Sequence, residues 1–240
     1  MGAETVARPT SIPAERPIVP LAAGAAPFAL LVLLYLLVGA PAIVLAGCVV
    51  AGFGITYLSG VDLNLEERLA FGTVLGAMAV AAASFIVSMV VRDVTLLTVL
   101  VGLAVSLAVG AGAAIAQRDR MKSDLADAAA RWWRSPRSPS HPWPLAAVLL
   151  VCGAWTLHFL SQAYVYKSDG LWAGYVNIWG DWAAHLSFAG AFAYGHNFPP
   201  QFPIDSGTNL GYPFMIDFLA ANLVPLGSHL TSTPILTSGI

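Results

Sequence analysis

The sequence predicts an all-α integral membrane protein, a polytopic transmembrane helix bundle with an extracytoplasmic segment that carries an interfacial helix. Of its 240 residues, 58% are hydrophobic and only 10% are charged, whereas soluble domains carry about 25% charged residues. The charges are also clustered, which leaves uncharged stretches long enough to span the hydrocarbon core as helices of about 20 residues. The lipid bilayer is therefore the first predicted partner.

Charge and cysteine content exclude other classes of protein. The net charge of −2 argues against a nucleic-acid partner, because phosphate neutralisation needs a basic surface. The two cysteines, Cys48 and Cys152, both lie in apolar runs. They form neither a disulfide framework nor the spacing of a zinc site.

Four transmembrane helices are expected within residues 21–116. Residues 1–20 contain four prolines and are expected to form a disordered cytoplasmic tail. The uncharged run that follows breaks at Gly39-Ala40-Pro41, because proline ends a helix. The expected helices cover residues 21–38, 42–58, 70–91 and 94–116, and residues 59–69 form a polar connection.

The second half is expected to alternate between polar segments and helices. Residues 117–143 form a basic loop, and residues 144–163 form the fifth transmembrane helix. Residues 164–212 form the extracytoplasmic segment. Residues 213–240 contain a sixth, short transmembrane helix to residue 226 and the start of a further apolar segment. The chain is therefore expected to be the N-terminal part of a longer protein.

The distribution of lysine and arginine predicts the orientation. Six basic residues lie in 117–143, whereas residues 164–212 contain only Lys167. Because basic loops stay on the cytoplasmic side, residues 117–143 and the N-terminus are placed in the cytoplasm. Residues 164–212 are placed outside.

Asp181 and His185 are the first candidate site. Residues 182–194 contain no proline and only one glycine, and they are expected to form a semi-apolar helix along the membrane interface. Residues four apart share a helix face, so this pair could act as a base and its partner or hold a divalent cation. Asp181 could instead cap the helix N-terminus, with His185 as its local partner.

Other polar residues leave two interpretations open. Asp217 lies one turn inside an apolar helix, where an ionisable group indicates a functional site, unless it lies at the interface close to Pro213. Asp205 and His196 are in turn-rich stretches, where such residues also occur for local reasons. The tryptophans and tyrosines of residues 164–212, Tyr212 among them, fit an aromatic interface belt.

Several short motifs resemble bacterial polytopic membrane proteins related to the GT-C glycosyltransferases, which include the dolichyl-phosphate-mannose protein mannosyltransferases. The motifs are Gly180-Asp181-Trp182-Ala183-Ala184-His185, Asn197-Phe198-Pro199-Pro200, Gly207, Gly211-Tyr212-Pro213 and Asp217, with weaker support from Glu67-Arg68-Leu69-Ala70-Phe71-Gly72. Together they cover about residues 165–227.

This resemblance implies a membrane enzyme of the bacterial plasma (inner) membrane that transfers a sugar from a polyprenyl-phosphate donor on the outer face. It implies Asp181 as the catalytic carboxylate and His185 as its partner, or both as ligands of Mg²⁺ or Mn²⁺. Tyr212, Asp217, Asp205 and His196 are the expected substrate-binding residues.

This sequence departs from the pattern of the better-known GT-C enzymes in two ways. In those enzymes the acidic loop follows the first helix, whereas four predicted spans precede the candidate span here. The expected helices are also fewer than such enzymes have. The alternative is a non-catalytic membrane protein, such as an envelope-assembly scaffold or a transporter component.

Overall fold

The computed structural model describes residues 21–134, 143–174, 179–205 and 207–238. Four helical segments in this part of the chain are long and apolar enough to cross a membrane. They are α2 (Pro41–Ile55) with the 3-10 turn η1 (Thr56–Leu58), α3 (Leu65–Val91), α4 (Leu96–Ala116) and α6 (Trp143–Ala163). The predicted all-α membrane bundle is confirmed. The first helix, α1, covers Leu21–Val38, as expected, and the predicted tail lies outside the described residues.

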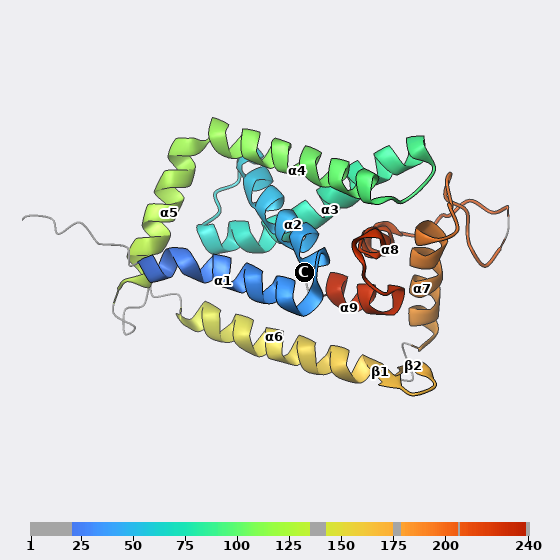
Figure 1. Cartoon of the computed structure of the whole chain (residues 1–240). Helices are drawn as coiled ribbons and strands as arrows, with labels where there is room; N and C mark the ends of the chain where they lie inside the picture. Colours follow the sequence, from blue (N-terminus) through green and yellow to red (C-terminus); the bar gives the residue numbers. More distant parts are fainter. Residues whose placement is uncertain (1–20, 135–142, 175–178, 206, 239–240) are drawn as a thin grey trace, which may run out of the picture.

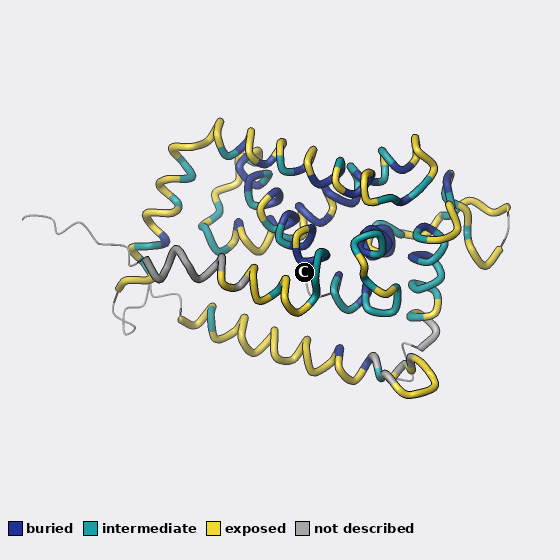
Figure 2. Tube along the Cα trace, in the orientation of Figure 1, coloured by how far each residue is buried: buried dark blue, intermediate teal, exposed yellow. Residues whose placement is uncertain are grey.

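Helices α2, α3 and α4 form the tightly packed centre of the bundle, and Figure 2 shows most buried residues there. Glycines allow this close approach: a Cβ on Gly72 of α3 would lie 2.7 Å from the backbone nitrogen of Phe53 in α2. A Cβ on Gly76, one turn later, would overlap the carbonyl of Cys48. Small residues four apart are the usual means by which membrane helices bring their backbones together.

Helix α3 begins at Leu65, five residues before the expected start at Ala70. The Asn64 side chain accepts a hydrogen bond from the Glu67 backbone N–H, and the Glu67 carboxylate accepts one from the Asn64 N–H. This capping box satisfies two otherwise unpaired donors of the first turn. The polar residues expected to form a connection therefore belong to the helix.

The predicted basic loop also contains a helix, α5 (Arg118–Trp132). The stretch has no proline or glycine and is rich in alanine, which favours a helix. Figure 1 shows α5 lying across the end of the bundle where α4 ends and α6 begins. We call this the α5 end; residues 135–142 lie outside the described residues.

The opposite end of the bundle is formed by the segment expected to be extracytoplasmic. It contains a hairpin of β1 (Tyr164–Lys167) and β2 (Gly170–Ala173), paired antiparallel with Tyr164 opposite Ala173. Helix α7 (Trp179–Ala193) follows and confirms the helix predicted here. In Figure 1, α7 runs across this end of the bundle, crosswise to α4 and α6. We call this the α7 end.

A cluster of phenylalanines fixes the α7 end on the bundle. Phe85 of α3 packs against Phe198, Phe214 and Phe218, and Phe192 of α7 packs against the same three rings, with centroids 5.2–6.2 Å apart. Phe192 and Phe218 are fully buried. Burial of each such ring contributes about 1.5–3 kcal/mol, so this cluster holds α7 and the chain that follows it in place.

The expected sixth transmembrane helix is much shorter in the structure. Helix α8 covers only Met215–Asn222, which is about 12 Å long, whereas the hydrocarbon core is about 30 Å thick. Pro225 and the left-handed Gly227 interrupt the chain after it. Short turns η2 (Val224–Leu226) and η3 (Leu230–Ser232) lead to α9 (Thr233–Ser238).

Candidate functional site

A histidine and a carboxylate meet between α7 and α8 at the α7 end. The Nδ1 atom of His185 lies 2.7 Å from Oδ1 of Asp217. The Asp217 side chain is 6% exposed and that of His185 is 28% exposed. The carboxylate is therefore enclosed by protein, whereas the imidazole reaches the surface. Two candidates that are 32 residues apart in the sequence thus form one pair.

Aromatic rings hold the histidine in position. The Tyr212 ring lies 6.0 Å from the His185 ring and 5.4 Å from that of Phe188, which is one turn further along α7. Phe188 is buried, but Tyr212 is 46% exposed. An imidazole packed among rings and bonded to a buried carboxylate has few orientations available. The surface beside it is aromatic and accessible through Tyr212.

Asp217 is held in an unusual environment for a carboxylate. Helix α8 is not one of the four spanning segments, but burial still raises the pKa of Asp217, and the hydrogen bond from His185 partly opposes this increase. Within the described residues, the second oxygen, Oδ2, is buried without a hydrogen-bond partner. Among the described residues, His185 thus provides the side-chain hydrogen bond that this carboxylate accepts.

We assign the proton of neutral His185 to Nδ1, because that nitrogen faces the carboxylate. Nδ1–H then donates to Asp217, and Nε2 retains its lone pair. A carboxylate that orients an imidazole in this way prepares it to accept a proton from a hydroxyl.

Asp181, the other predicted catalytic residue, lies in the first turn of α7 and is exposed. It is one turn before His185 on the same helix, but the described contacts pair His185 with Asp217 instead. Among the described residues, no group of three or more His, Cys, Asp or Glu side chains could hold a metal ion. The Mg²⁺ or Mn²⁺ site at Asp181 and His185 therefore stays a prediction, and the chemistry below is derived without it.

The remaining two predicted residues make local contacts. Asp205 accepts a hydrogen bond from the hydroxyl of Thr208 at 2.7 Å, within a turn. His196 Nδ1 lies 2.9 Å from Oδ1 of Asp93 in the turn between α3 and α4. These contacts agree with the structural interpretation of both residues, and they do not join either one to the pair of His185 and Asp217.

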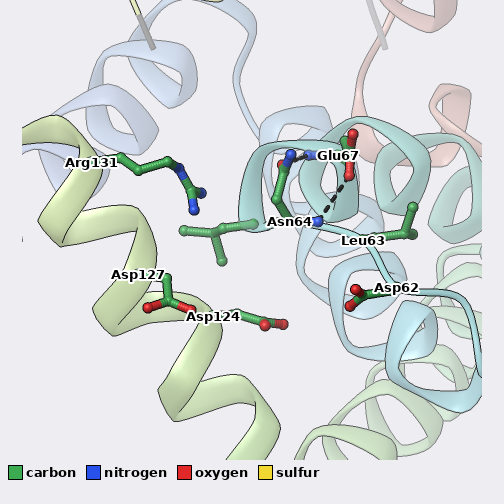
Figure 3. A pocket seen from close by; sticks show the side chains of 8 residues that line it. Asp62, Leu63, Asn64, Glu67, Asp124, Asp127 and Arg131 are labelled. Carbon is green, nitrogen blue, oxygen red and sulfur yellow. Dashed lines mark hydrogen bonds between the residues drawn. The ribbon is translucent and has the colours of Figure 1, made fainter. Parts of the chain in front are cut away.

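A second polar cluster, at the α5 end, was not predicted as a site. Arg68 is fully buried, donates from Nε to Asp124 of α5 at 2.8 Å and lies over the Tyr57 ring at 4.2 Å. A pocket of about 320 Å³ lies beside it, lined by residues of the α3 start and of α5 (Figure 3). The sequence signal was the Asn64-x-x-Glu67 capping pattern, which would have placed Arg68 inside the helix.

No family model, curated protein or solved structure matches this chain.

Proposed function

We propose that this chain forms the outer catalytic region of a glycosyltransferase-like enzyme of the bacterial plasma membrane. The enzyme would transfer a sugar from a polyprenyl-phosphate donor, and the α7 end would face outward. The observation that carries this proposal is the contact between His185 and the buried Asp217, beside the accessible Tyr212 ring. The cluster of lysine and arginine in residues 117–143 supports the orientation.

The position of the pair suits a lipid-linked donor. A polyprenyl phosphate keeps its chain in the hydrocarbon and presents its phosphate and sugar at the membrane surface. Helix α7 lies across the end of the bundle (Figure 1), and in this proposal that end meets the membrane surface, where His185 of α7 would meet such a sugar. The Tyr212 ring offers a face on which a sugar ring can stack.

In the proposed reaction, the oxygen of an acceptor hydroxyl attacks the anomeric carbon of the donor sugar. The bond between that carbon and the phosphate oxygen breaks, and polyprenyl phosphate leaves with the electron pair. Nε2 of His185 takes the proton from the attacking hydroxyl. Asp217 keeps the imidazole oriented and stabilises the imidazolium that forms. In this proposal Asp181, exposed one turn away on α7, contacts the acceptor.

The test uses the full-length protein in its own membranes, with radiolabelled polyprenyl-phosphate mannose and polyprenyl-phosphate glucose as donors. His185→Ala and Asp217→Asn should each lower sugar transfer by about 10²–10⁴-fold, the usual contribution of a general base and its orienting group. His229→Ala is the control, because His229 is an exposed histidine in the chain after α8.

Expression level and thermal stability of each variant separate loss of chemistry from loss of fold. The proposal fails if both variants fold and still transfer sugar at the rate of the unaltered protein. A full-length protein with no transfer from either donor would favour the non-catalytic alternative, a scaffold or a transporter component.

A further inference from the structure

Helix α6 contacts the rest of the described chain mainly near its end. Of the 21 residues of α6, Leu160 and Ala163 are buried, and Trp182 of α7 and Ile235 of α9 pack against them. Figure 2 shows α6 exposed along most of its length. Because α6 is long and apolar enough to cross a membrane, this exposed surface meets either lipid or another protein helix.

His158 is an exposed ionisable residue of this spanning helix. It precedes Ala163, the last residue of α6, by about 7.5 Å along the helix. Helical side chains lean toward the N-terminus of their helix, which carries the imidazole further from that end. The ring of Trp155, one turn deeper, packs against it with centroids 6.2 Å apart. His158 is therefore placed in the hydrocarbon and not at its edge.

The central helices of the bundle treat such polar side chains differently. Ser84 and Ser88 of α3 and Ser106 of α4 are all buried, and the hydroxyls of Ser84 and Ser106 each donate to a carbonyl of their own helix. Ionisable residues within membrane spans almost always face protein or a water-filled cavity and not lipid. The exposed imidazole of His158 therefore indicates that protein covers this side of α6.

His158 also belongs to a row of exposed residues with the spacing of paired helices. We call this row the α6 seam; it consists of Ala147, Val151, Ala154, His158 and Ser161. Successive members are alternately four and three residues apart, which is the heptad spacing of two helices in contact. At about 100° per residue they fall within an arc of about 80°, whose centre is about 140–160° from the buried Leu160 and Ala163. The small alanines would let a second helix approach closely.

The chemistry of the α6 seam fits a second copy of the same seam. In a parallel pair of helices related by a twofold axis, each core position of one helix meets the same position of the other. Neutral imidazole carries one N–H donor and one acceptor nitrogen, so two copies of His158 can hydrogen-bond to each other without a partner of opposite charge. The Ser161 hydroxyl already donates to the His158 carbonyl at 2.7 Å and needs no partner across the seam.

We propose that two copies of this chain associate through the α6 seam as parallel helices, with the alanines in contact and the two His158 imidazoles hydrogen-bonded across the axis. The single polar core position fixes the register of the pair, as polar residues do in coiled coils. The α7 ends of the two copies then lie on the same side of the membrane. This association does not depend on the proposed sugar transfer.

The first experiment measures disulfide formation between copies of the full-length protein in its own membranes, with copper phenanthroline as oxidant and Cys48→Ala in every variant. Ala154→Cys, combined with Cys152→Ala, should form a disulfide-linked dimer. The native Cys152 is the matched control, because it is also exposed on α6 but lies about 160° around the helix from Ala154, and it should form little dimer. The proposal is overturned if Ala154→Cys remains monomeric or cross-links to a different protein.

The second experiment measures the dimerisation constant in lipid vesicles by single-molecule photobleaching. His158→Leu should weaken dimerisation by about threefold or more, the usual contribution of a hydrogen bond between membrane helices. His158→Asn keeps a donor and an acceptor and should retain most of the affinity. Thr156→Val is the control, because Thr156 is exposed about 160° around α6 from His158 and its hydroxyl can bond to its own helix backbone. A monomeric unaltered protein, or undiminished dimerisation of His158→Leu, would refute the proposal.

Discussion

The close approach of α2 and α3 predicts that one added methyl group at Gly72 destabilises the protein. A Cβ there would lie 2.7 Å from the Phe53 nitrogen and 2.9 Å from the Gly52 carbonyl carbon, well inside an ordinary contact of about 3.5 Å. Both neighbours are backbone atoms, which cannot rotate away as a side chain can. The two helices would have to move apart along their whole contact.

The expected size follows from two opposing effects. Forcing extra volume into a packed interface costs about 1–3 kcal/mol, and the rigid neighbours place Gly72→Ala at the upper end. Alanine is a better helix former than glycine by up to about 1 kcal/mol. The net loss is about 2 kcal/mol, which lowers the melting temperature of a chain of this size by about 4–8 °C.

The assay is thermal unfolding of the detergent-purified protein, followed by circular dichroism. Gly112→Ala is the control, because Gly112 lies in α4 but a Cβ there meets nothing within 4 Å. That variant should be neutral or slightly stabilised. Equal melting temperatures for the Gly72 and Gly112 variants would show that the bundle centre is not packed as described.

Three further predictions concern buried polar groups. Asp124→Ala leaves the buried Arg68 without its carboxylate and should lower the free energy of unfolding, measured with denaturant, by about 3 kcal/mol. The double variant R68M/D124L should recover most of this loss. A double variant as unstable as Asp124→Ala would contradict this explanation. Asn222→Leu should change stability by less than about 1 kcal/mol, because Ser84, to which Asn222 donates at 2.9 Å, keeps its bond to the Val80 carbonyl. Because burial raises the pKa of Asp217, folding takes up a proton there, so stability should fall as pH rises from the unfolded pKa toward the raised folded one. Asp217→Asn should remove that part of the slope in melting temperature against pH, and an unchanged slope would refute the assignment.

Sequence patterns predicted the helices that depend on local properties. Helix α1 has the expected bounds, and α4 and α6 differ from theirs by only one or two residues, because an uncharged apolar stretch of that length has few alternatives in a membrane protein. The predictions for two polar stretches differ from the structure for the same reason. Polarity predicts a loop in residues 59–69 and 117–143, but Asn64 and Glu67 form a capping box and the charges of α5 pair with the start of α3.

In the candidate site, too, the sequence identified the residues but not all of their contacts. The sequence identified His185 and Asp217 as separate candidates, since an ionisable group in an apolar helix is conspicuous by itself. It joined His185 to Asp181, because spacing along one helix is the only proximity that a single sequence reveals. That His185 meets Asp217 depends on how α7 and α8 pack around the phenylalanine cluster. Composition and hydropathy thus determined the membrane class and the helices, whereas tertiary packing alone decided which polar groups meet, since that depends on residues far apart in the chain.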